Sequence, residues 1–250
     1  MSSKWNAYKR NLSRSDFKTS NLLLPKELWQ DTVPFSWIKY MITQKIMNIL
    51  HDAIQIFDKR CGMRYLIIFG TKSHYQFVQI QIKQSHFWHL LGCKLISDTN
   101  EEKRNTYLNC KNKIDVSGKI FSIHGYSEIQ EKFQAIQNVF DFISNAHQTK
   151  IGYAVDCPEQ YIFQIGTGNE RGIIGYDYPS VGSKSFLIPK SAQLKSLSKV
   201  SKTAFRIFVI LSKEQHQKAY ENIEYEIKKG ITSKYLSELP EEININLKTQ

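Results

Sequence analysis

The feature that most constrains the fold is a change of apolar periodicity near Lys150. Before it, an apolar stripe at helical spacing predicts a helix over residues 36–58. After it, short apolar runs bounded by turn residues predict an antiparallel meander. The predicted strands of this meander are residues 151–156, 160–166, 171–177 and 184–189, with a further strand at 204–212. This order predicts an α+β fold with a mainly antiparallel sheet.

A hairpin and a helical insert are predicted between these two regions. Residues 63–70 and 75–83 carry the apolar patterns of two strands around a Gly-containing turn. Two capping-box patterns follow, and each predicts the start of a helix: Thr99 with Glu102, and Ser127 with Gln130. A short connecting helix is predicted between them at residues 115–123. The turns predicted within the meander are Cys157-Pro-Glu, Gly166-Thr-Gly-Asn and Pro179-Ser-Val-Gly.

The expected organisation is one domain with short extensions. A C-terminal helix is predicted over residues 214–237 from the spacing of its apolar residues. The α+β domain is expected to occupy residues 35–240, between a basic, loosely ordered arm at 1–34 and a tail at 241–250. The arm carries Trp5 and Trp29, through which it could dock against a partner.

The composition is that of a globular protein without a membrane-spanning segment. Apolar residues make up 41% of the 250 residues, and no apolar run approaches the roughly 20 residues that cross a bilayer. The basic N-terminus is not followed by the apolar stretch of a signal peptide, so we expect a cytoplasmic protein. The four cysteines lie far apart and form no C-x-x-C pair. This favours reduced thiols over a zinc site or a disulfide framework.

The distribution of charge points to a polyanionic partner. The chain has 34 Lys and Arg against 23 Asp and Glu, a formal charge of +11. Residues 178–213, here called the basic block, contain no acidic residue. Its cations are Lys184, Lys190, Lys195, Lys199, Lys202, Arg206 and Lys213. A solvated surface is the alternative, but a block of one sign this long favours contact with the phosphates of a nucleic acid.

Two histidines stand where the second hairpin strand gives way to a helical pattern. His86 and His89 are interleaved with Phe87, Trp88 and Leu90, and Gly92 closes the segment. Imidazoles at such a junction are suited to proton transfer near neutral pH. Their i, i+3 spacing would also suit a metal pair, but the chain has no H-E-x-x-H pattern and no third ligand cluster nearby. A structural histidine satisfied by the backbone is the remaining alternative.

The run from Gly166 to Gly172, Gly-Thr-Gly-Asn-Glu-Arg-Gly, resembles a phosphate-binding loop only superficially. Its spacing matches neither the dinucleotide fingerprint nor the Walker loop, and strands are predicted on both sides. A hairpin turn is therefore the favoured interpretation. Arg171 leaves this turn and could still reach a ligand.

The segment around His89 resembles a nuclease signature. His89-Leu-Leu-Gly92, with Phe87 before it and Lys94-Leu95 and Asp98 after it, is similar to the F-x-H-L-[TI]-G motif of a phage-associated nuclease family. This family is the phage branch of the barnase, EndoU, colicin and RelE-like (BECR-fold) nucleases. The order of elements, a hairpin, a helical insert and a meander with a late basic strand, is also similar. Leu91 stands where the family often has threonine.

The resemblance implies a metal-independent ribonuclease without a cofactor, of phage or prophage origin and acting in the cytoplasm of a bacterial host. Such cleavage needs a base for the ribose 2′-OH, cations for the phosphate and an acid for the departing 5′-oxygen. By the resemblance, His89 is the acid/base candidate and His86 its partner or orienting residue. Some relatives are toxins, so a toxin or effector role follows as an expectation, with RNA, tRNA included, as substrate.

Further site residues are assigned from their places on the predicted sheet. Lys184 and Ser185 are expected to join the histidines in catalysis, Ser185 by donating a hydrogen bond. Tyr176 and Tyr178 could stack a base, with core packing as the alternative. The predicted phosphate contacts are Arg171, Lys190, Lys195, Lys199, Lys202 and Arg206.

Two other functions stay open at this point. The same fold could bind nucleic acid through the basic block without cutting it. It could also act by binding a protein partner, an antitoxin being one such partner.

Overall fold

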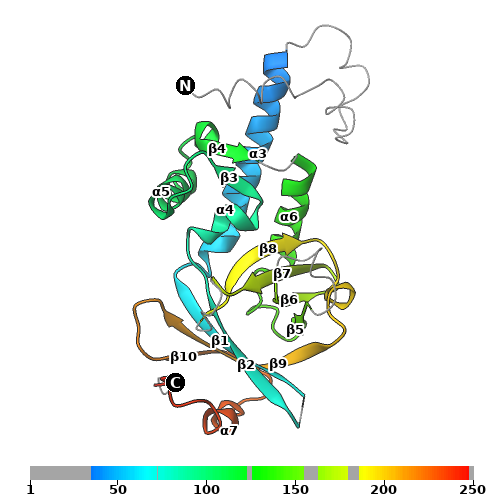
Figure 1. Ribbon diagram of the computed structural model, residues 1–250, viewed down its shortest axis with the longest axis vertical. Coiled ribbons are helices and arrows are strands. Elements are labelled where there is room, and N and C mark those ends of the chain that lie inside the picture. Colours follow the sequence, from blue (N-terminus) through cyan, green and yellow to red (C-terminus); the bar gives the residue numbers. More distant parts are fainter. Residues whose placement is uncertain (1–34, 72, 123–125, 155–162, 180–185, 248–250) are drawn as a thin grey trace.

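The computed structural model describes residues 35–71, 73–122, 126–154, 163–179 and 186–247. The predicted arm and the turn that begins at Cys157 lie outside these ranges. The elements in chain order (Figure 1) are α3 (Phe35–Asp58), β1 (Met63–Gly70), β2 (Tyr75–Gln81), α4 (His86–Leu90), β3 (Cys93–Leu95), α5 (Asn100–Lys111), η2 (Ser117–Lys119), β4 (Ile120–Ser122), α6 (Tyr126–Val139), β5 (Lys150–Tyr153), β6 (Ile165–Asn169), β7 (Gly172–Asp177), β8 (Ile188–Gln193), η3 (Leu197–Lys199), β9 (Ala204–Glu214), β10 (Asn222–Glu226) and α7 (Thr232–Leu236).

The predicted N-terminal helix is confirmed as α3, and its apolar stripe faces the core. Leu50, Ile54 and Phe57 are fully buried. The helix packs against α5 and α6, and the Phe57 ring stacks on Phe140 at a centroid distance of 5.0 Å. Burying three large apolar side chains contributes about 1.5–3 kcal/mol each, which fixes the helical layer on the sheet.

The predicted antiparallel sheet is confirmed, and it curls until its two ends meet. The strand order is β2-β1-β9-β5-β6-β7-β8, with β10 paired to the second half of β9. The hairpin β1–β2 forms as predicted. At the far end, Leu187 pairs with Ile80 of β2, because Gln81 N–H donates to the Leu187 carbonyl and Leu187 N–H to the Gln79 carbonyl, both at 2.8 Å. The closed curl therefore brings β8 beside β2.

Different elements pack on the two faces of the sheet at β7. Gly172 approaches Ala135 and Val139 of α6, and Ile174 belongs to the main core with α6. Ile173, between them, packs instead with Phe163, Leu197 and Val200 in a separate cluster. Because side chains alternate along a strand, α6 and η3 lie on opposite faces of β7.

Several predicted boundaries in the insert and the meander are wrong. Within residues 115–122, the predicted connecting helix is limited to the short 3₁₀ turn η2, which gives way to β4, and β4 pairs with β3. The cap of α5 is as predicted, with Glu102 N–H donating to Thr99 Oγ1 at 3.2 Å. Helix α6 already begins at Tyr126, so Ser127 lies inside it. The Gly166–Asn169 segment, predicted as a turn, belongs to strand β6. The turn lies at residues 169–172 instead.

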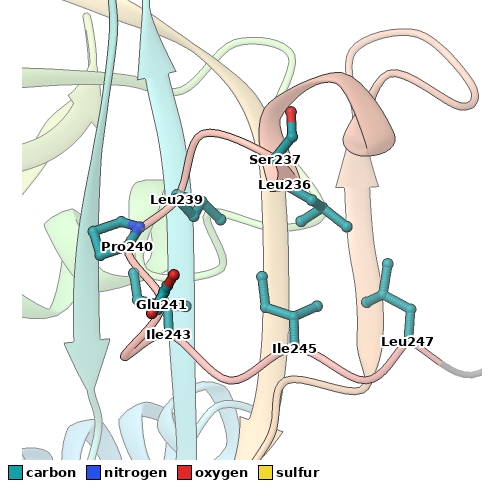
Figure 2. A pocket seen from close by; sticks show the side chains of 8 residues that line it. All are labelled: Leu236, Ser237, Leu239, Pro240, Glu241, Ile243, Ile245 and Leu247. Atoms are coloured by element: carbon teal, nitrogen blue, oxygen red, sulfur yellow. The ribbon is translucent and has the colours of Figure 1, made fainter.

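The predicted C-terminal helix is wrong over most of its range. Residues 222–226 form β10, which pairs with β9, and only Thr232–Leu236 are helical. Of the residues assigned to a tail, 244–247 run beside Tyr220, where Asn246 N–H donates to the Tyr220 carbonyl at 2.9 Å. Ile243, Ile245 and Leu247 line a pocket of ≈ 500 Å³ under α7 (Figure 2). Helix α7 and this segment lie at the end of the molecule opposite helices α3, α5 and α6 (Figure 1).

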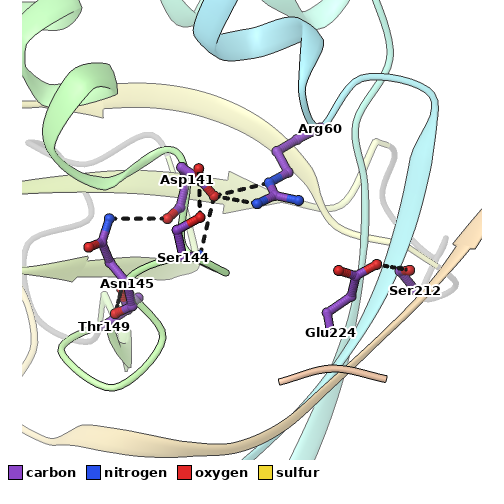
Figure 3. Close-up of polar contacts among 7 residues, drawn as sticks. All are labelled: Arg60, Asp141, Ser144, Asn145, Thr149, Ser212 and Glu224. Atoms are coloured by element: carbon purple, nitrogen blue, oxygen red, sulfur yellow. Dashed lines mark hydrogen bonds and ion pairs between the residues drawn. The ribbon is translucent and has the colours of Figure 1, made fainter. Parts of the chain in front are cut away.

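A partly buried ion pair ties α3 to the segment after α6. Arg60 Nε and Nη2 both donate to Asp141 Oδ1, Nη2 at 2.5 Å (Figure 3). Asp141 also accepts from the Ser144 hydroxyl at 3.0 Å. Elsewhere in the same view, Ser212 of β9 donates to Glu224 of β10. The first pair therefore joins the end of α3 to the segment after α6, and the second joins two neighbouring strands.

Candidate active site

Helix α4 presents His89 from a short, rigidly held turn. Gly92 ends the turn with a φ of 71°, a left-handed conformation that glycine adopts without steric cost, and its N–H donates to the His89 carbonyl at 3.0 Å. Phe87, Trp88 and Leu90 are buried. The Trp88 indole Nε1–H donates to the Lys103 carbonyl of α5 at 2.9 Å. His89 is thus the exposed side chain of a helix whose other face is locked in the core.

Three lysines from three different elements lie near enough to His89 for their charges to act on it. They are Lys103 of α5, Lys132 of α6 and Lys190 of β8, and we call them the lysine cluster. Partial burial of the imidazole and the positive charges of Lys190, Lys132 and Lys103 lower the pKa of His89, and the nearby Asp98 carboxylate opposes that shift. His89 is therefore a neutral imidazole at pH 7, able to accept a proton.

The lysines of the cluster differ in how their charge is compensated. Lys103 forms an ion pair with Asp98 at 2.8 Å, and Lys132 lies 3.9 Å from Glu128. Lys190 forms no ion pair with any residue in the described ranges. Burial lowers the pKa of Lys132, with the neighbouring carboxylates opposing. The cluster thus offers net positive charge beside a neutral base.

His86 is also neutral at pH 7, but its ring is held by a hydrogen bond to the backbone. Its Nδ1 accepts the Lys83 backbone N–H at 3.1 Å, so a neutral ring carries its proton on Nε2. Burial, followed by the charges of Lys83 and Lys190, lowers the pKa of His86 to about 3. A proton on Nδ1 would break the bond to Lys83. His86 therefore fixes the chain that enters α4, while His89 stays accessible.

The other predicted site residues do not gather at His89. Lys184 and Ser185 lie outside the described residues. Tyr176 is fully buried and its hydroxyl lies 3.1 Å from the Thr167 hydroxyl, so we do not retain base stacking for it. Tyr178 is half-buried and packs on the main core. Arg171 is exposed in the β6–β7 turn, where its N–H donates to Asn169 Oδ1.

The cations of the basic block do not all lie on the same face of the sheet. Lys190 faces α4, whereas η3, with Lys199, packs on the opposite face through Leu197. Lys195 and Lys202 flank η3 in the chain, and Arg206 is exposed on β9 opposite Lys150. Lys213 is buried, and its Nζ donates to the Lys218 carbonyl at 2.8 Å. Of the block's described cations, Lys190 is therefore the one whose charge acts on the histidines.

Sequence reasoning missed Lys103 and Lys132. Lys103 directly follows the first predicted capping box, and Lys132 lies shortly after the second, next to the buried Phe133. Both helices were predicted, but nothing in either helix indicates that it approaches His89. A polar residue at the border of an apolar stripe is the one local signal that Lys132 is half-buried.

The described ranges contain neither a cluster of metal-ligand side chains nor a membrane-spanning helix. No group of three or more His, Cys, Asp and Glu side chains is arranged there to hold a metal ion. None of the helices described has the length and apolarity that crossing a bilayer requires.

Comparison with known families shows to which protein family the chain belongs. Residues 49–229 match the model of a family described as phage-Barnase-EndoU-ColicinE5/D-RelE like nuclease4 (PBECR4). The match covers well over half of the chain, which therefore belongs to this family of phage-type BECR nucleases, and the resemblance drawn from the His89 motif is confirmed. Nucleic acid is accordingly its substrate class. No curated protein and no solved structure matches the chain.

Proposed function

We propose that this nuclease is a metal-independent endoribonuclease in which His89 removes the proton of the ribose 2′-OH. The observation that carries the proposal is a neutral, exposed imidazole set among three lysines. The lysine cluster supplies the positive charge that a divalent cation supplies in other nucleases. Membership of a nuclease family supports nucleic acid as the substrate class.

The first half of the reaction follows from the states of these side chains. His89 accepts the 2′-OH proton, and the 2′-oxygen then attacks the adjacent phosphorus. Negative charge grows on the phosphate oxygens, where Lys190, Lys132 and Lys103 stabilise it. Fixed charges of this kind, aimed at developing charge, typically contribute about 3–4 kcal/mol for a single donor.

The second half requires a group that donates a proton to the departing 5′-oxygen. The attacking and leaving oxygens lie roughly in line, so a group other than the base has to reach the leaving oxygen. Lys132 is our candidate, because burial lowers its pKa and thereby makes its ammonium group a stronger acid. Lys103 and Lys190 would then act through charge alone.

The first test incubates the full chain with RNA in EDTA, beside His89→Ala. We expect cleavage to fragments ending in a 2′,3′-cyclic phosphate, reduced about 10²–10⁴-fold by the substitution. His147→Ala, at an exposed histidine after α6, is the matched control and should cleave normally. A substrate with one 2′-deoxyribose at the cut site should resist. Loss of wild-type cleavage in EDTA would contradict the metal-free mechanism.

Lys132→Arg separates the acid from the electrostatic role. Arginine keeps the positive charge but does not release a proton at accessible pH. We expect RNA binding to be retained and cleavage to fall about 10²-fold or more, with cleavage restored for a substrate whose leaving group needs no proton, such as a nitrophenyl ester. Equal loss on both substrates would assign Lys132 to charge stabilisation instead.

A toxin or effector role is proposed from the same chemistry. Induced expression in bacterial cells should arrest growth and fragment cellular RNA, and His89→Ala should do neither. Arrest by both forms would point away from cleavage and toward binding.

A further inference from the structure

A second concave region adjoins α4 at the connection that leads into it from β2. It is a pocket of ≈ 710 Å³ between the end of α3, the β2–α4 connection and the start of α5. Its volume lies in the range of about 300–1,000 Å³ typical of small-ligand sites. The side chains at its rim are Lys83, Gln84, Ser85, His86, Asn100 and Arg104.

The floor of this pocket is preorganised. Gln215 N–H donates to the Gly62 carbonyl at 3.1 Å, and its side-chain amide donates to the Ile82 carbonyl at 2.9 Å. Asp58 accepts from the Tyr107 hydroxyl at 3.0 Å and from Lys111 Nζ at 2.7 Å. These hydrogen bonds satisfy the polar groups of the floor. The floor is therefore a fixed surface with few groups left to bond a ligand.

The rim, in contrast, offers uncommitted polar groups. Within the described part of the chain, no hydrogen bond or ion pair engages the side chains of Lys83, Gln84, Ser85, Asn100 and Arg104. Asn100 and Arg104 stand one turn apart on α5 and share a face. The neighbouring Cys61 is not a reactive group, because burial raises the pKa of its thiol to about 12.

His86 and α5 connect the pocket to the His89 site. His86 lines the pocket, and the charges of Lys190, His89 and Lys103 help to lower its pKa. On α5, Lys103 belongs to the lysine cluster while the adjacent Arg104 belongs to the pocket. A ligand in the pocket would therefore lie beside whatever occupies the lysine cluster.

We propose that this pocket binds one nucleoside of the substrate, next to the phosphate held at His89, and thereby selects the base at the cleavage position. Asn and Gln amides and an Arg guanidinium are the side chains that read base edges, and Arg can also stack on a base where no aromatic ring lines the site. Lys83 and Arg104 give the pocket positive charge for an adjoining phosphate. The inference rests on the proposed ribonuclease function.

The experiment compares the double variant Asn100→Ala, Arg104→Ala with Asn105→Ala, an exposed amide on α5 outside the pocket. Each protein digests a random-sequence RNA, and sequencing of the fragment ends gives the base preference around the cut. We expect the wild type and Asn105→Ala to prefer one base by roughly 5- to 100-fold at one flanking position. The double variant should still cleave but lose that preference. A wild type without preference, or a preference that the double variant keeps, overturns the inference and leaves the ribonuclease proposal intact.

If the wild type does not cleave RNA, the ribonuclease proposal fails and the pocket is tested separately. The four nucleoside 5′-monophosphates are titrated into each protein and followed by NMR chemical shifts. Saturable binding by the wild type and Asn105→Ala, weakened at least tenfold in the double variant, supports a nucleotide pocket. Absence of binding to the wild type, or equal binding by all three proteins, overturns it. Circular dichroism of each variant confirms that it is folded.

Discussion

The face of the sheet that carries α4 and the face that carries η3 receive lysines from the same basic block but differ in what surrounds them. On the α4 face, Lys190 joins Lys103 and Lys132 around His89 and lowers its pKa. On the η3 face, Lys199 stands exposed over a small apolar cluster with Leu197. The face with converging charges is the one that also holds the neutral base.

The difference shows that a run of cations in the sequence is not a patch of cations on the surface. Lys190 lies on β8 and Lys199 on η3, and η3 packs on the opposite face of the sheet through Leu197. Coulomb attraction falls with distance and is screened within about 10 Å in ordinary salt. A lysine across the sheet therefore contributes little at His89, however close it lies in the chain.

The largest effect that distinguishes the two faces should come from charge reversal. We expect Lys190→Glu to lower kcat/KM for RNA by about 10²–10³-fold, because it removes one stabilising charge and adds a repelling one beside the phosphate. Lys199→Glu makes the same chemical change on the η3 face and should lower kcat/KM by only a few-fold, through weaker long-range attraction. Steady-state cleavage of a defined RNA measures both. Equal losses would mean that both faces contact the substrate.

A core substitution on the η3 face should separate stability from activity. Leu197 is buried between Ile173 and Val200, so Leu197→Ala should lower the free energy of unfolding by about 2–5 kcal/mol. Cleavage per folded molecule should stay close to wild type, since α4 and the lysine cluster lie across the sheet. Urea denaturation gives the first quantity, and activity corrected for the folded fraction gives the second. A selective loss of cleavage would show that the two faces are coupled.

A smaller effect is expected from the pH dependence of stability on the α4 face. The folded-state pKa of His86, about 3, lies below the ordinary histidine value of 6.5, so between these values the unfolded chain binds more protons. Stability therefore falls as pH drops from 6.5 toward 3, by about 3 kcal/mol at pH 4 from this residue.

His86→Asn is the matching variant, because an asparagine oxygen can accept the same Lys83 N–H without titrating. Urea denaturation at pH 4 and pH 7 should show a smaller difference for His86→Asn than for the wild type. An unchanged difference would mean that His86 is not held neutral. His216→Asn, at an exposed histidine, is the control.

Much of the fold could be predicted from local pattern, but strands such as β6 and β10 could not. Helix α3 and the β1–β2 hairpin were predicted because their periodicities are strong and uninterrupted. Residues 214–237 were predicted as a helix because Tyr220, Ile223 and Ile227 fit helical spacing, whereas β10 forms because β9 offers it a hydrogen-bonding edge. The glycines of β6 suggested a turn, but a Cβ at Gly168 would lie 2.3 Å from the Gly172 carbonyl oxygen. Close strand packing, absent from any local pattern, explains them.

The sequence by itself determined the α+β class and the strand-to-helix junction at α4, and its six-residue motif indicated His89 as the candidate base, because these depend on neighbours in the chain. Only the tertiary structure decided which lysines meet that histidine. Lys103, Lys132 and Lys190 come from two helices and a strand that are distant in sequence, and they converge because the sheet curls and the helices pack on one of its faces. Charge acts through space, so the partners of His89 follow from packing and not from order along the chain.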